Sequence, residues 1–251
     1  MKDIKMADYT GDPMGVAIYD YYKNGHAGVL KVYSSDFDDD EIPVSDLFRS
    51  KDEMPELEQI ALNMAEGAIL DVGAGSGCHS IALQASGKQV KAIDISPLSV
   101  EVMKERGIDA IHVNLYDSDF KEKFDTILML MNGTGIIGNL ENIPSFFARM
   151  KELLHPGGSV LIDSSDLRYL FEEEDGSLMI DLADDYYGQL DYQMEYVNAS
   201  HESLEGIKGE PFDWLYLDFD TLAFYAEENG FCAEMVAEGE HYDYLAKLTL
   251  L

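Results

Sequence analysis

The middle of the chain alternates between short apolar runs and helix-like stretches, and this alternation constrains the fold more than any other feature. Five runs have the continuous apolar character of strands buried on both faces, at 68–72, 89–94, 110–113, 124–129 and 159–163. Between them lie three helix candidates, at 79–85, 97–106 and 143–154, the last followed by a turn at 155–158. Because crossovers between parallel strands are right-handed, the series predicts an α/β fold with a doubly wound, mostly parallel sheet.

The regions on either side of this series divide the chain into four parts. They are an N-terminal arm, the core series, an insertion and a C-terminal segment, at residues 1–66, 67–165, 166–217 and 218–251. The C-terminal segment is expected to complete the edge of the sheet with one helix and a two-stranded hairpin, at 221–229, 233–237 and 244–250.

The arm and the insertion hold less regular elements. The expected elements are helices at 12–23 and 55–64, a strand at 29–33, and two strands of the insertion, 192–197 and 212–217, paired across a turn at 206–209. Two acidic runs, 36–41 and 172–175, are most simply solvated loops. Both segments are rich in aromatic residues, and an open α/β sheet binds its ligand beyond the carboxyl ends of its strands. We therefore expect residues 9–49 and 166–217 to form a roof over that edge.

The chain carries 17 basic and 49 acidic residues, a formal net charge of −32 at pH 7. Such a surface repels nucleic acid, because binding phosphodiesters depends on neutralisation by Lys and Arg, and it disfavours anionic membranes likewise. Adaptation to high salt is a competing account of the same charge. The apolar runs fall far short of a membrane span, the first residues lack an apolar signal core, and Cys78 and Cys232 form neither a disulfide framework nor a zinc spacing. A cytoplasmic protein is expected.

A glycine-rich turn directly after the first core run carries the clearest chemical signal. Gly73, Gly75 and Gly77 let the backbone turn tightly and let a ligand approach main-chain amides without a Cβ in the way. A dinucleotide fingerprint has the spacing G-x-G-x-x-G, so the G-x-G-x-G spacing here disfavours an NAD-dependent reductase. Asp71 beside the turn suits a ligand with a cationic amino group, and Asp94 after the second run can accept both hydroxyls of a ribose.

Over roughly residues 68–163, and more loosely over the last helix and hairpin, these motifs resemble the class I S-adenosylmethionine-dependent methyltransferases. Residues 69–77 resemble the loop under the methionine moiety, and 124–131 resembles the fourth-strand motif. The resemblance implies S-adenosyl-L-methionine as the cofactor and a seven-stranded sheet with the arm and the insertion as a lid. Asn114 stands where the family usually has Asp, which keeps an acceptor and loses a charge. The cofactor-binding residues so implied are Asp71, Gly73, Ala74, Gly75, Gly77, Asp94, Ile95, Asn114, Leu115 and Met131.

Few side chains are obliged to act in methyl transfer, because in-line displacement from a sulfonium depends mainly on alignment and a dry pocket. The catalytic candidates are Asn132 after the fourth run and His79 at the first helix. Both candidates also have a structural interpretation. Asn132 fits a glycine-rich turn without a catalytic role, and His79 fits a residue that caps the helix or packs at its start. Candidate substrate contacts are Arg49, Asn132 and Asp166, although Arg49 could equally reach the methionine carboxylate or neutralise acidic neighbours. His155, at the opposite edge, is expected to be structural.

No metal site is expected. Asp163 and Ser164 stand where metal-dependent catechol-type methyltransferases carry an Asp-Asn pair, and Ser is a poor substitute. The sequence thus predicts a methyltransferase acting on a small-molecule acceptor, with neither nucleic acid nor membrane as a partner. Two alternatives stay open: a protein that binds S-adenosylmethionine or S-adenosylhomocysteine without transferring the methyl group, and a protein methyltransferase that recruits a basic peptide to its acidic surface.

Overall fold

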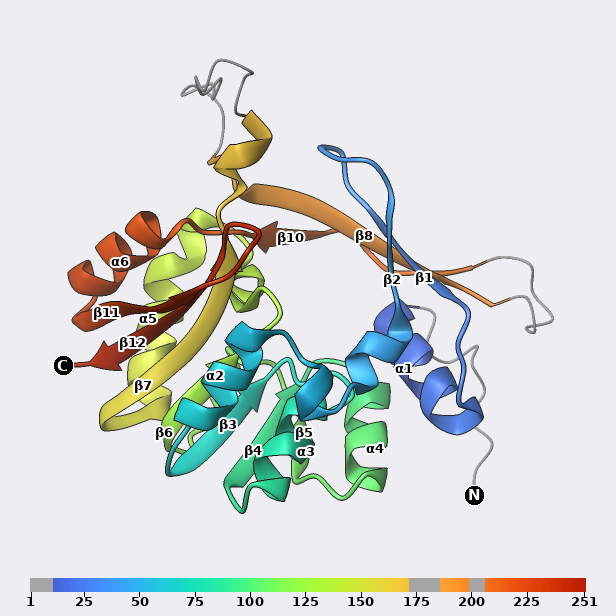
Figure 1. Ribbon diagram of the computed structural model, residues 1–251, viewed down its shortest axis with the longest axis horizontal. Coiled ribbons are helices and arrows are strands. Elements are labelled where there is room, and N and C mark those ends of the chain that lie inside the picture. Colours follow the sequence, from blue (N-terminus) through green and yellow to red (C-terminus); the bar gives the residue numbers. More distant parts are fainter. Residues whose placement is uncertain (1–10, 172–185, 199–205) are drawn as a thin grey trace.

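The computed structural model describes residues 11–171, 186–198 and 206–251, and its centre is a seven-stranded sheet (Figure 1). The strands are β3 (Ala68–Val72), β4 (Gln89–Asp94), β5 (Ala110–His112), β6 (Phe124–Met129), β7 (Leu154–Ser165), β11 (Phe231–Glu238) and β12 (Asp243–Leu250). Their order is β11-β12-β7-β6-β3-β4-β5, in which the five strands from β7 to β5 are parallel and β12 and β11 are antiparallel. The predicted doubly wound, mostly parallel sheet is confirmed, with its topological switch point between β3 and β6.

Helices cover both faces of this sheet because successive strand residues point to opposite sides. They are α2 (Glu56–Met64), α3 (Cys78–Ala85), α4 (Pro97–Glu105), α5 (Ile143–Leu153) and α6 (Phe219–Glu228). Leu70 and Ile127 belong to the core that includes α5 and α6, whereas their neighbours Ile69 and Leu128 pack with α2 and α3. The central strands are therefore apolar on both faces, which explains why their sequences show no polar alternation.

β7 begins earlier than the sequence predicts. The preceding helix ends at Leu153, and Leu154 already pairs with Phe124 of β6. The register shifts beyond that pair, so residues 155–158 form an irregular stretch within the strand instead of a separate turn. Gly157, at φ 79°, supplies the left-handed conformation that this irregularity uses.

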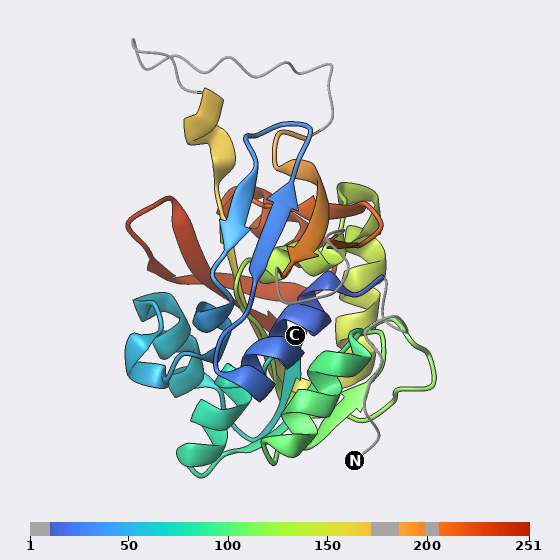
Figure 2. The same ribbon diagram turned by 90° about the vertical axis from the view of Figure 1, so that its right-hand side faces the viewer.

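A second, antiparallel sheet lies across the carboxyl ends of the central strands, and we call it the roof sheet (Figures 1 and 2). Its strands are β1 (Val29–Tyr33), β2 (Asp40–Ile42), β8 (Gln189–Val197), β9 (Ile207–Lys208) and β10 (Phe212–Leu215). The order is β10-β8-β1-β2, with β9 beside β8. The arm and the insertion thus share one sheet, in which β1 pairs with β8 from Val29 opposite Val197 to Tyr33 opposite Gln193.

Two expected loops of these segments contain strand residues. The acidic run 36–41 leads into β2, where a glutamate lies opposite a lysine of β1 and this pair of opposite charges favours the strand. The expected turn at 206–209 contains β9, which pairs with β8. The predicted pairing between the insertion strands is confirmed for β8 and β10. The acidic stretch 172–175 lies outside the described residues, as do residues 1–10.

Helix α1 (Pro13–Asn24) ties the roof sheet to the core. Its Val16 and Ile18 share an apolar cluster with Leu98 of α4. Asp12 caps the helix, and its second carboxylate oxygen accepts a hydrogen bond of 2.6 Å from the hydroxyl of Ser96, just after β4. Short 3-10 turns complete the described chain: η2 (Val44–Phe48), η3 (Lys51–Glu53), η4 (Gly133–Ile137), η5 (Leu140–Asn142) and η6 (Leu167–Phe171). None of the helices in the described ranges has the length and apolar character that crossing a membrane requires.

Candidate active site

The glycine-rich turn joins β3 to α3 and is held against β4 by main-chain bonds. The amides of Gly73 and Ala74 both donate to the carbonyl oxygen of Ile93, at 2.9 and 3.2 Å. Gly77 precedes α3 at φ 81°, and a Cβ there would lie 2.2 Å from Cδ1 of Ile108. Glycine is required at this position because the left-handed backbone and the close contact both oppose a side chain.

Asp94 at the end of β4 closes this turn from the neighbouring strand. Its two carboxylate oxygens accept hydrogen bonds from the amides of Gly75 and Ser96, both at 2.8 Å. Burial raises the pKa of Asp94, and the two amide bonds oppose that rise only in part. Each oxygen keeps a further lone pair, so the carboxylate can still accept from a ligand diol. Ile95, the next residue, is 70% exposed at the same edge.

The residues after β5 are divided between the site and the core. Asn114 is exposed, and its Oδ1 accepts a hydrogen bond of 2.9 Å from the amide of Tyr116. Leu115, which the sequence placed in the cofactor contact set, is 3% exposed and belongs to the central core. Its carbonyl accepts a bond of 2.6 Å from Nε of Arg149. Leu115 therefore faces away from the site, and the exposed large side chain at this position is Tyr116.

Asp71 does not face the open side of the glycine turn. It is 2% exposed and accepts a hydrogen bond of 2.7 Å from the hydroxyl of Ser80 in α3. The sequence suggested a carboxylate beside a cationic ligand group, whereas the structure directs it beneath the helix. Asp71 thus ties the turn to the helix that follows.

His79, Glu58 and Arg49 form a buried row of charged side chains beside the turn. Nε2 of His79 lies 2.7 Å from one carboxylate oxygen of Glu58, and the other oxygen is paired with Arg49. Burial lowers the pKa of His79, but the hydrogen bond to Glu58 and the charge of Asp71 outweigh this effect, and the pKa is raised. Nε of Arg49 is buried without a partner in the described part of the chain. His79 is 5% exposed, which agrees with a packing residue and not with a group that contacts an acceptor.

The turn after β6 is strained, and Asp163 of β7 holds it. Met131 and Asn132 are consecutive non-glycine residues with φ of 67° and 60°, conformations that cost free energy and concentrate at functional sites. Asp163 accepts hydrogen bonds from the amides of Met131 at 3.0 Å and Gly133 at 2.8 Å. Burial raises the pKa of Asp163 to about 6. This carboxylate, at the position weighed for a metal ligand, is thus occupied by main-chain donors.

Asn132 and Asp166 lie at the carboxyl ends of the neighbouring strands β6 and β7. The hydroxyl of Ser165 donates to Oδ1 of Asn132 at 3.1 Å, which leaves the Nδ2 hydrogens of Asn132 as donors. Asp166 accepts a bond of 2.7 Å from Nε of Arg168 and one of 3.0 Å from the hydroxyl of Tyr187. Both sequence candidates therefore carry polar groups at the β6 and β7 part of the edge.

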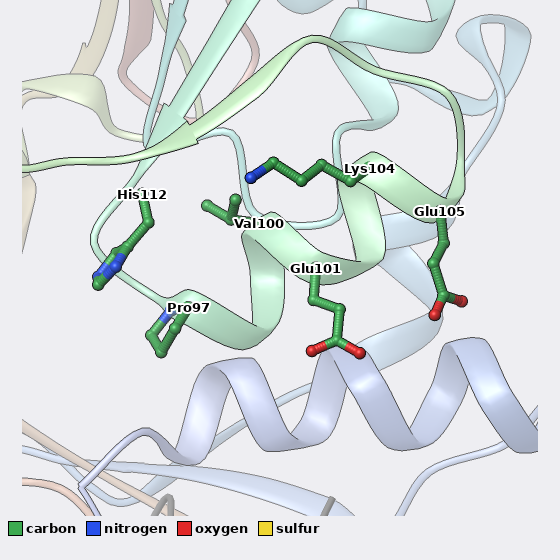
Figure 3. Close-up of a pocket in the computed structure, with 6 residues that line it drawn as sticks. All are labelled: Pro97, Val100, Glu101, Lys104, Glu105 and His112. Carbon is green, nitrogen blue, oxygen red and sulfur yellow. The ribbon is translucent and has the colours of Figure 1, made fainter. Parts of the chain in front are cut away.

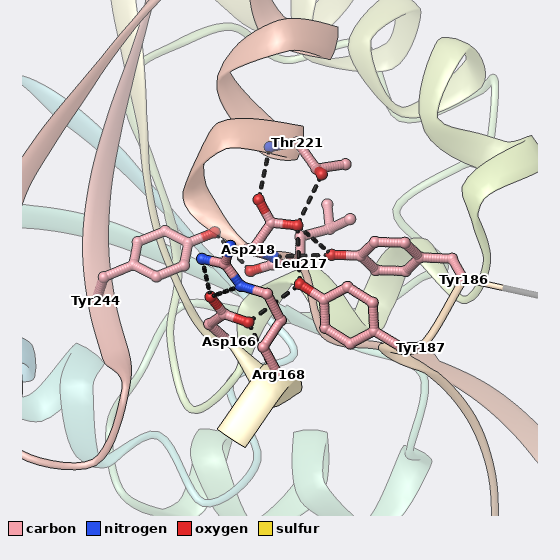
Figure 4. Close-up of polar contacts among 8 residues, drawn as sticks. All are labelled: Asp166, Arg168, Tyr186, Tyr187, Leu217, Asp218, Thr221 and Tyr244. Atoms are coloured by element: carbon pink, nitrogen blue, oxygen red, sulfur yellow. Dashed lines mark hydrogen bonds and ion pairs between the residues drawn. The ribbon is translucent and has the colours of Figure 1, made fainter. Parts of the chain in front are cut away.

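Tyr187 belongs to a larger polar cluster at the start of α6 (Figure 4). Asp218 caps this helix by accepting from the amide of Thr221 at 2.9 Å, and it accepts from the hydroxyls of Tyr186 at 2.6 Å and Tyr187 at 3.0 Å. Burial raises the pKa of Asp218, but these hydrogen bonds outweigh it and the pKa is lowered. Burial raises the pKa of both tyrosines. The two phenols therefore stay protonated and act as donors to a charged carboxylate.

The roof sheet contacts the strained turn and the element after it. Trp214 of β10 packs so closely on Gly135 that a Cβ there would lie 1.9 Å from Cε2 of the indole. Tyr216, just after β10, shares a hydroxyl contact of 3.2 Å with Tyr192 of β8. Burial raises the pKa of Tyr216, and the charge of Asp163 adds to the rise. Tyr216 is thus joined to β8 of the roof sheet through this hydroxyl contact.

A hollow of about 480 Å³ lies elsewhere, along α4 (Figure 3). It is lined by Pro97, Val100, Glu101, Lys104, Glu105 and His112. It is open to solvent, and no residue of the glycine turn lines it. We therefore assign the site to the carboxyl edge of the sheet and not to this hollow.

The structure gathers the predicted residues into two groups along that edge. The glycine turn, Asp94, Ile95 and Asn114 surround the ends of β3, β4 and β5, and Arg49 joins them from the arm. Met131, Asn132 and Asp166 follow β6 and β7. Sequence reasoning missed Glu58, Tyr216 and Asp218; only Asp218 carried a signal, as an acidic residue just before an expected helix.

The first group fits S-adenosylmethionine. It offers a turn of three left-handed glycines that have no side chain, a buried carboxylate beside an exposed apolar residue, and a buried guanidinium nitrogen without a partner among the described residues. The glycines allow a ligand to approach the main chain closely. The carboxylate of Asp94 can accept from ribose hydroxyls beside an adenine on Ile95, and the guanidinium of Arg49 can donate to the ligand's carboxylate.

Known methyltransferases are similar to the chain. A family model described as a methyltransferase domain matches residues 69–158. A methyltransferase from Bacteroides fragilis that depends on S-adenosylmethionine, solved with S-adenosyl-L-homocysteine, is 62% identical, with a TM-score of 0.88 over 96% of each chain. An uncharacterised methyltransferase from Staphylococcus carnosus is 27% identical over 180 residues, 68% of this chain and 85% of its own length. A cypemycin N-terminal methyltransferase from Streptomyces is 28% identical over 102 residues, which are 39% of this chain and only 42% of that protein.

Proposed function

Because the chain belongs to the class I S-adenosylmethionine-dependent methyltransferases, we propose that it transfers the methyl group to a small-molecule acceptor bound beneath the roof sheet. S-adenosylmethionine supplies an electrophilic methyl group on a sulfonium sulfur. The glycine turn would hold its methionine end, and Asp94 would accept the ribose hydroxyls. Ile95 would lie against the adenine, and Arg49 would donate to the carboxylate.

The way the roof sheet is seated supports a small acceptor. At one end, α1 is bound through Asp12 to Ser96 after β4. At the other end, Trp214 rests on Gly135 after β6. One continuous sheet is thus fixed at both ends of the carboxyl edge, an arrangement that favours a water-excluding chamber over an open groove for a folded protein.

The side chains on the β6 and β7 side would orient the acceptor. Asn132 would donate from Nδ2, because Ser165 already occupies its Oδ1. Asp166 and Tyr187 would bind a polar group of the acceptor at the end of β7. Such positioning is the main contribution that a protein makes to an in-line displacement.

Transfer assays on separated acceptor pools test this proposal. The full chain is incubated with methyl-labelled S-adenosylmethionine and either a small-molecule filtrate or the protein fraction of the same cell extract. We expect label in the filtrate compounds, with S-adenosylhomocysteine formed in equal amount. Asn132→Ala should slow that transfer without changing the affinity for S-adenosylhomocysteine, because Asn132 follows β6 and the cofactor residues surround β3 and β4.

The other outcomes separate the alternatives. Label in the protein fraction alone would identify a protein methyltransferase and overturn the proposal. Tight cofactor binding without transfer in either pool would indicate a binding protein. We also propose a cytoplasmic location without nucleic-acid partners, supported by the free thiols of Cys78 and Cys232 and the net charge of −32.

A further inference from the structure

Arg49 lies against the glycine turn with an unpartnered donor. The hydroxyl of Ser76 in the turn donates to the carbonyl of Leu47, so the residues that end η2 are held beside the turn. The positive charge of Arg49 acts on Cys78 and His79 at the start of α3. Its Nε is buried and has no partner within the described ranges. A buried donor costs free energy until a ligand supplies an acceptor, which points to an anionic ligand group at this place.

Glu58 divides its carboxylate between two basic side chains. One oxygen is bound to a terminal guanidinium nitrogen of Arg49, and the other lies 2.7 Å from Nε2 of His79. The side chains of Glu58 and His79 are each 6% exposed, and that of Arg49 is 15% exposed. A carboxylate bound on both sides fixes the guanidinium in one orientation and neutralises only part of its charge. Arg49 therefore keeps an attraction for a further anion.

A second carboxylate extends the row beyond His79. The charge of Asp71 also acts on the imidazole of His79, and Asp71 is itself bound to Ser80 of α3. Along Asp71, His79, Glu58 and Arg49, acidic and basic side chains alternate. The row begins under the first turn of α3 and ends at the unpartnered Nε of Arg49.

We propose that Glu58 and His79 are positioning residues that hold Arg49 in place to bind the carboxylate of S-adenosylmethionine beside the glycine turn. Neither residue touches the cofactor. Their role concerns the carboxylate of the cofactor alone, so it is independent of the identity of the methyl acceptor.

Two ligands that differ in this carboxylate test the proposal. S-adenosylhomocysteine carries the amino-acid moiety, and 5′-methylthioadenosine has the same adenosine thioether without it. Affinities for the full chain are measured by isothermal titration calorimetry. Arg49→Ala should weaken S-adenosylhomocysteine roughly 10- to 100-fold and leave methylthioadenosine nearly unchanged, because one charge-assisted hydrogen bond is lost. Glu58→Gln should weaken S-adenosylhomocysteine selectively by about 5- to 20-fold, since a neutral amide holds the guanidinium of Arg49 less firmly than a carboxylate does.

A double variant and a matched control complete the design. In Arg49→Ala/Glu58→Gln the second substitution should add no further loss, because the group that Glu58 positions is already gone. His79→Gln should shift the ratio of the two affinities in the same direction as Glu58→Gln. Glu53→Gln removes an exposed carboxylate bound to Ser50 on the preceding turn and should leave both affinities unchanged.

Three results would overturn the proposal. If Glu58→Gln weakened the binding of both ligands equally, Glu58 would have a merely structural role. The comparison of the two affinities remains valid even if the variant is less stable. Tighter binding of S-adenosylhomocysteine by Glu58→Gln would show that Glu58 mainly neutralises Arg49. Additive losses of affinity in the double variant would show that Glu58 does not act through Arg49.

Discussion

The cofactor edge, made of the glycine turn with Asp94, and the roof sheet are held together by different kinds of bond. At the cofactor edge the donors are main-chain amides, such as those of Gly73 and Gly75. The strands of the roof sheet also pair through main-chain bonds, but side chains anchor the sheet to its surroundings, as in the bond of 2.7 Å from the hydroxyl of Tyr196 to Asp20 of α1. A site built from main chain is sensitive to backbone geometry, whereas one built from side chains changes with each substitution. Acceptor selectivity can therefore vary while cofactor binding stays constant.

Gly77→Ala should produce the largest effect, and at the cofactor edge. A left-handed alanine costs about 1 to 2 kcal/mol and the clash with Ile108 about 1 to 3 kcal/mol more. We expect the free energy of unfolding to fall by about 3 kcal/mol in urea titrations, with weaker binding of S-adenosylhomocysteine. Gly87→Ala is the control, because Gly87 has a φ of 77° but nothing within 4 Å of a Cβ. Equal losses in the two variants would show that packing at Gly77 is unimportant.

Asp94→Ala should weaken the cofactor more than the fold. The loss of charge-assisted bonds corresponds to roughly 1.5 to 3 kcal/mol, or a 10- to 150-fold lower affinity for S-adenosylhomocysteine by calorimetry. The main-chain bonds from Gly75 and Ser96 are lost as well, so part of this effect reflects a less ordered turn. Asp109→Ala, an exposed acid before β5, is the control. An unchanged affinity in folded Asp94→Ala protein would refute the ribose assignment.

Tyr196→Phe should loosen the roof sheet and spare the cofactor edge. The lost hydroxyl accepts from the amide of Gly28 and donates to Asp20, both at 2.7 Å, and Tyr196 is 1% exposed. Asp20 keeps its bond from Asn198, so the cost of roughly 1 to 3 kcal/mol comes mainly from the amide of Gly28, which loses its acceptor. We expect faster amide hydrogen exchange in β1 and β8 and slower transfer, with unchanged affinity for S-adenosylhomocysteine. Loss of cofactor affinity would contradict the independence of the two regions.

The smallest effect concerns Asp163, which links both regions through the strained turn. Its pKa of about 6 exceeds the value of about 3.9 in an unfolded chain. The folded state therefore binds the proton more tightly, and the resulting stability is full below about pH 4 and lost as the pH rises through 6. Between pH 5 and 7.5 this group should lower the free energy of unfolding by about 1.4 kcal/mol. Urea titrations of Asp163→Asn should lack this component; identical pH profiles of the two chains would refute it.

The cofactor edge was predictable because its determinants are local. Apolar runs specify buried strands, and the left-handed conformations at Gly73, Gly75 and Gly77 require glycines that are visible in the sequence. The side-chain directions were less accessible. Leu115 turns into the core because Arg149 of α5 binds its carbonyl, and that contact joins residues 34 positions apart. Likewise, periodicity cannot reveal that Glu58 of α2 is the partner of His79.

The roof sheet shows the same limit on a larger scale. The sequence identified strands at 29–33 and 192–197, but a strand pattern does not specify its partner. The pairing of β1 with β8 depends on where the intervening core places both segments. The sequence thus predicted where the two segments lie, but only the structure shows that they share one sheet.

The connectivity of the roof sheet also sets an order of assembly. Gly28 and Tyr196, which bond across it, are 168 residues apart, whereas all five parallel strands lie between them in the chain. During synthesis β1 emerges long before β8 exists, and contacts over such separations form slowly. We expect the central sheet to fold first and the roof sheet to close last. A newly made chain would then acquire its cofactor site before the roof sheet that we propose covers the acceptor, and in unfolding it would lose that cover first.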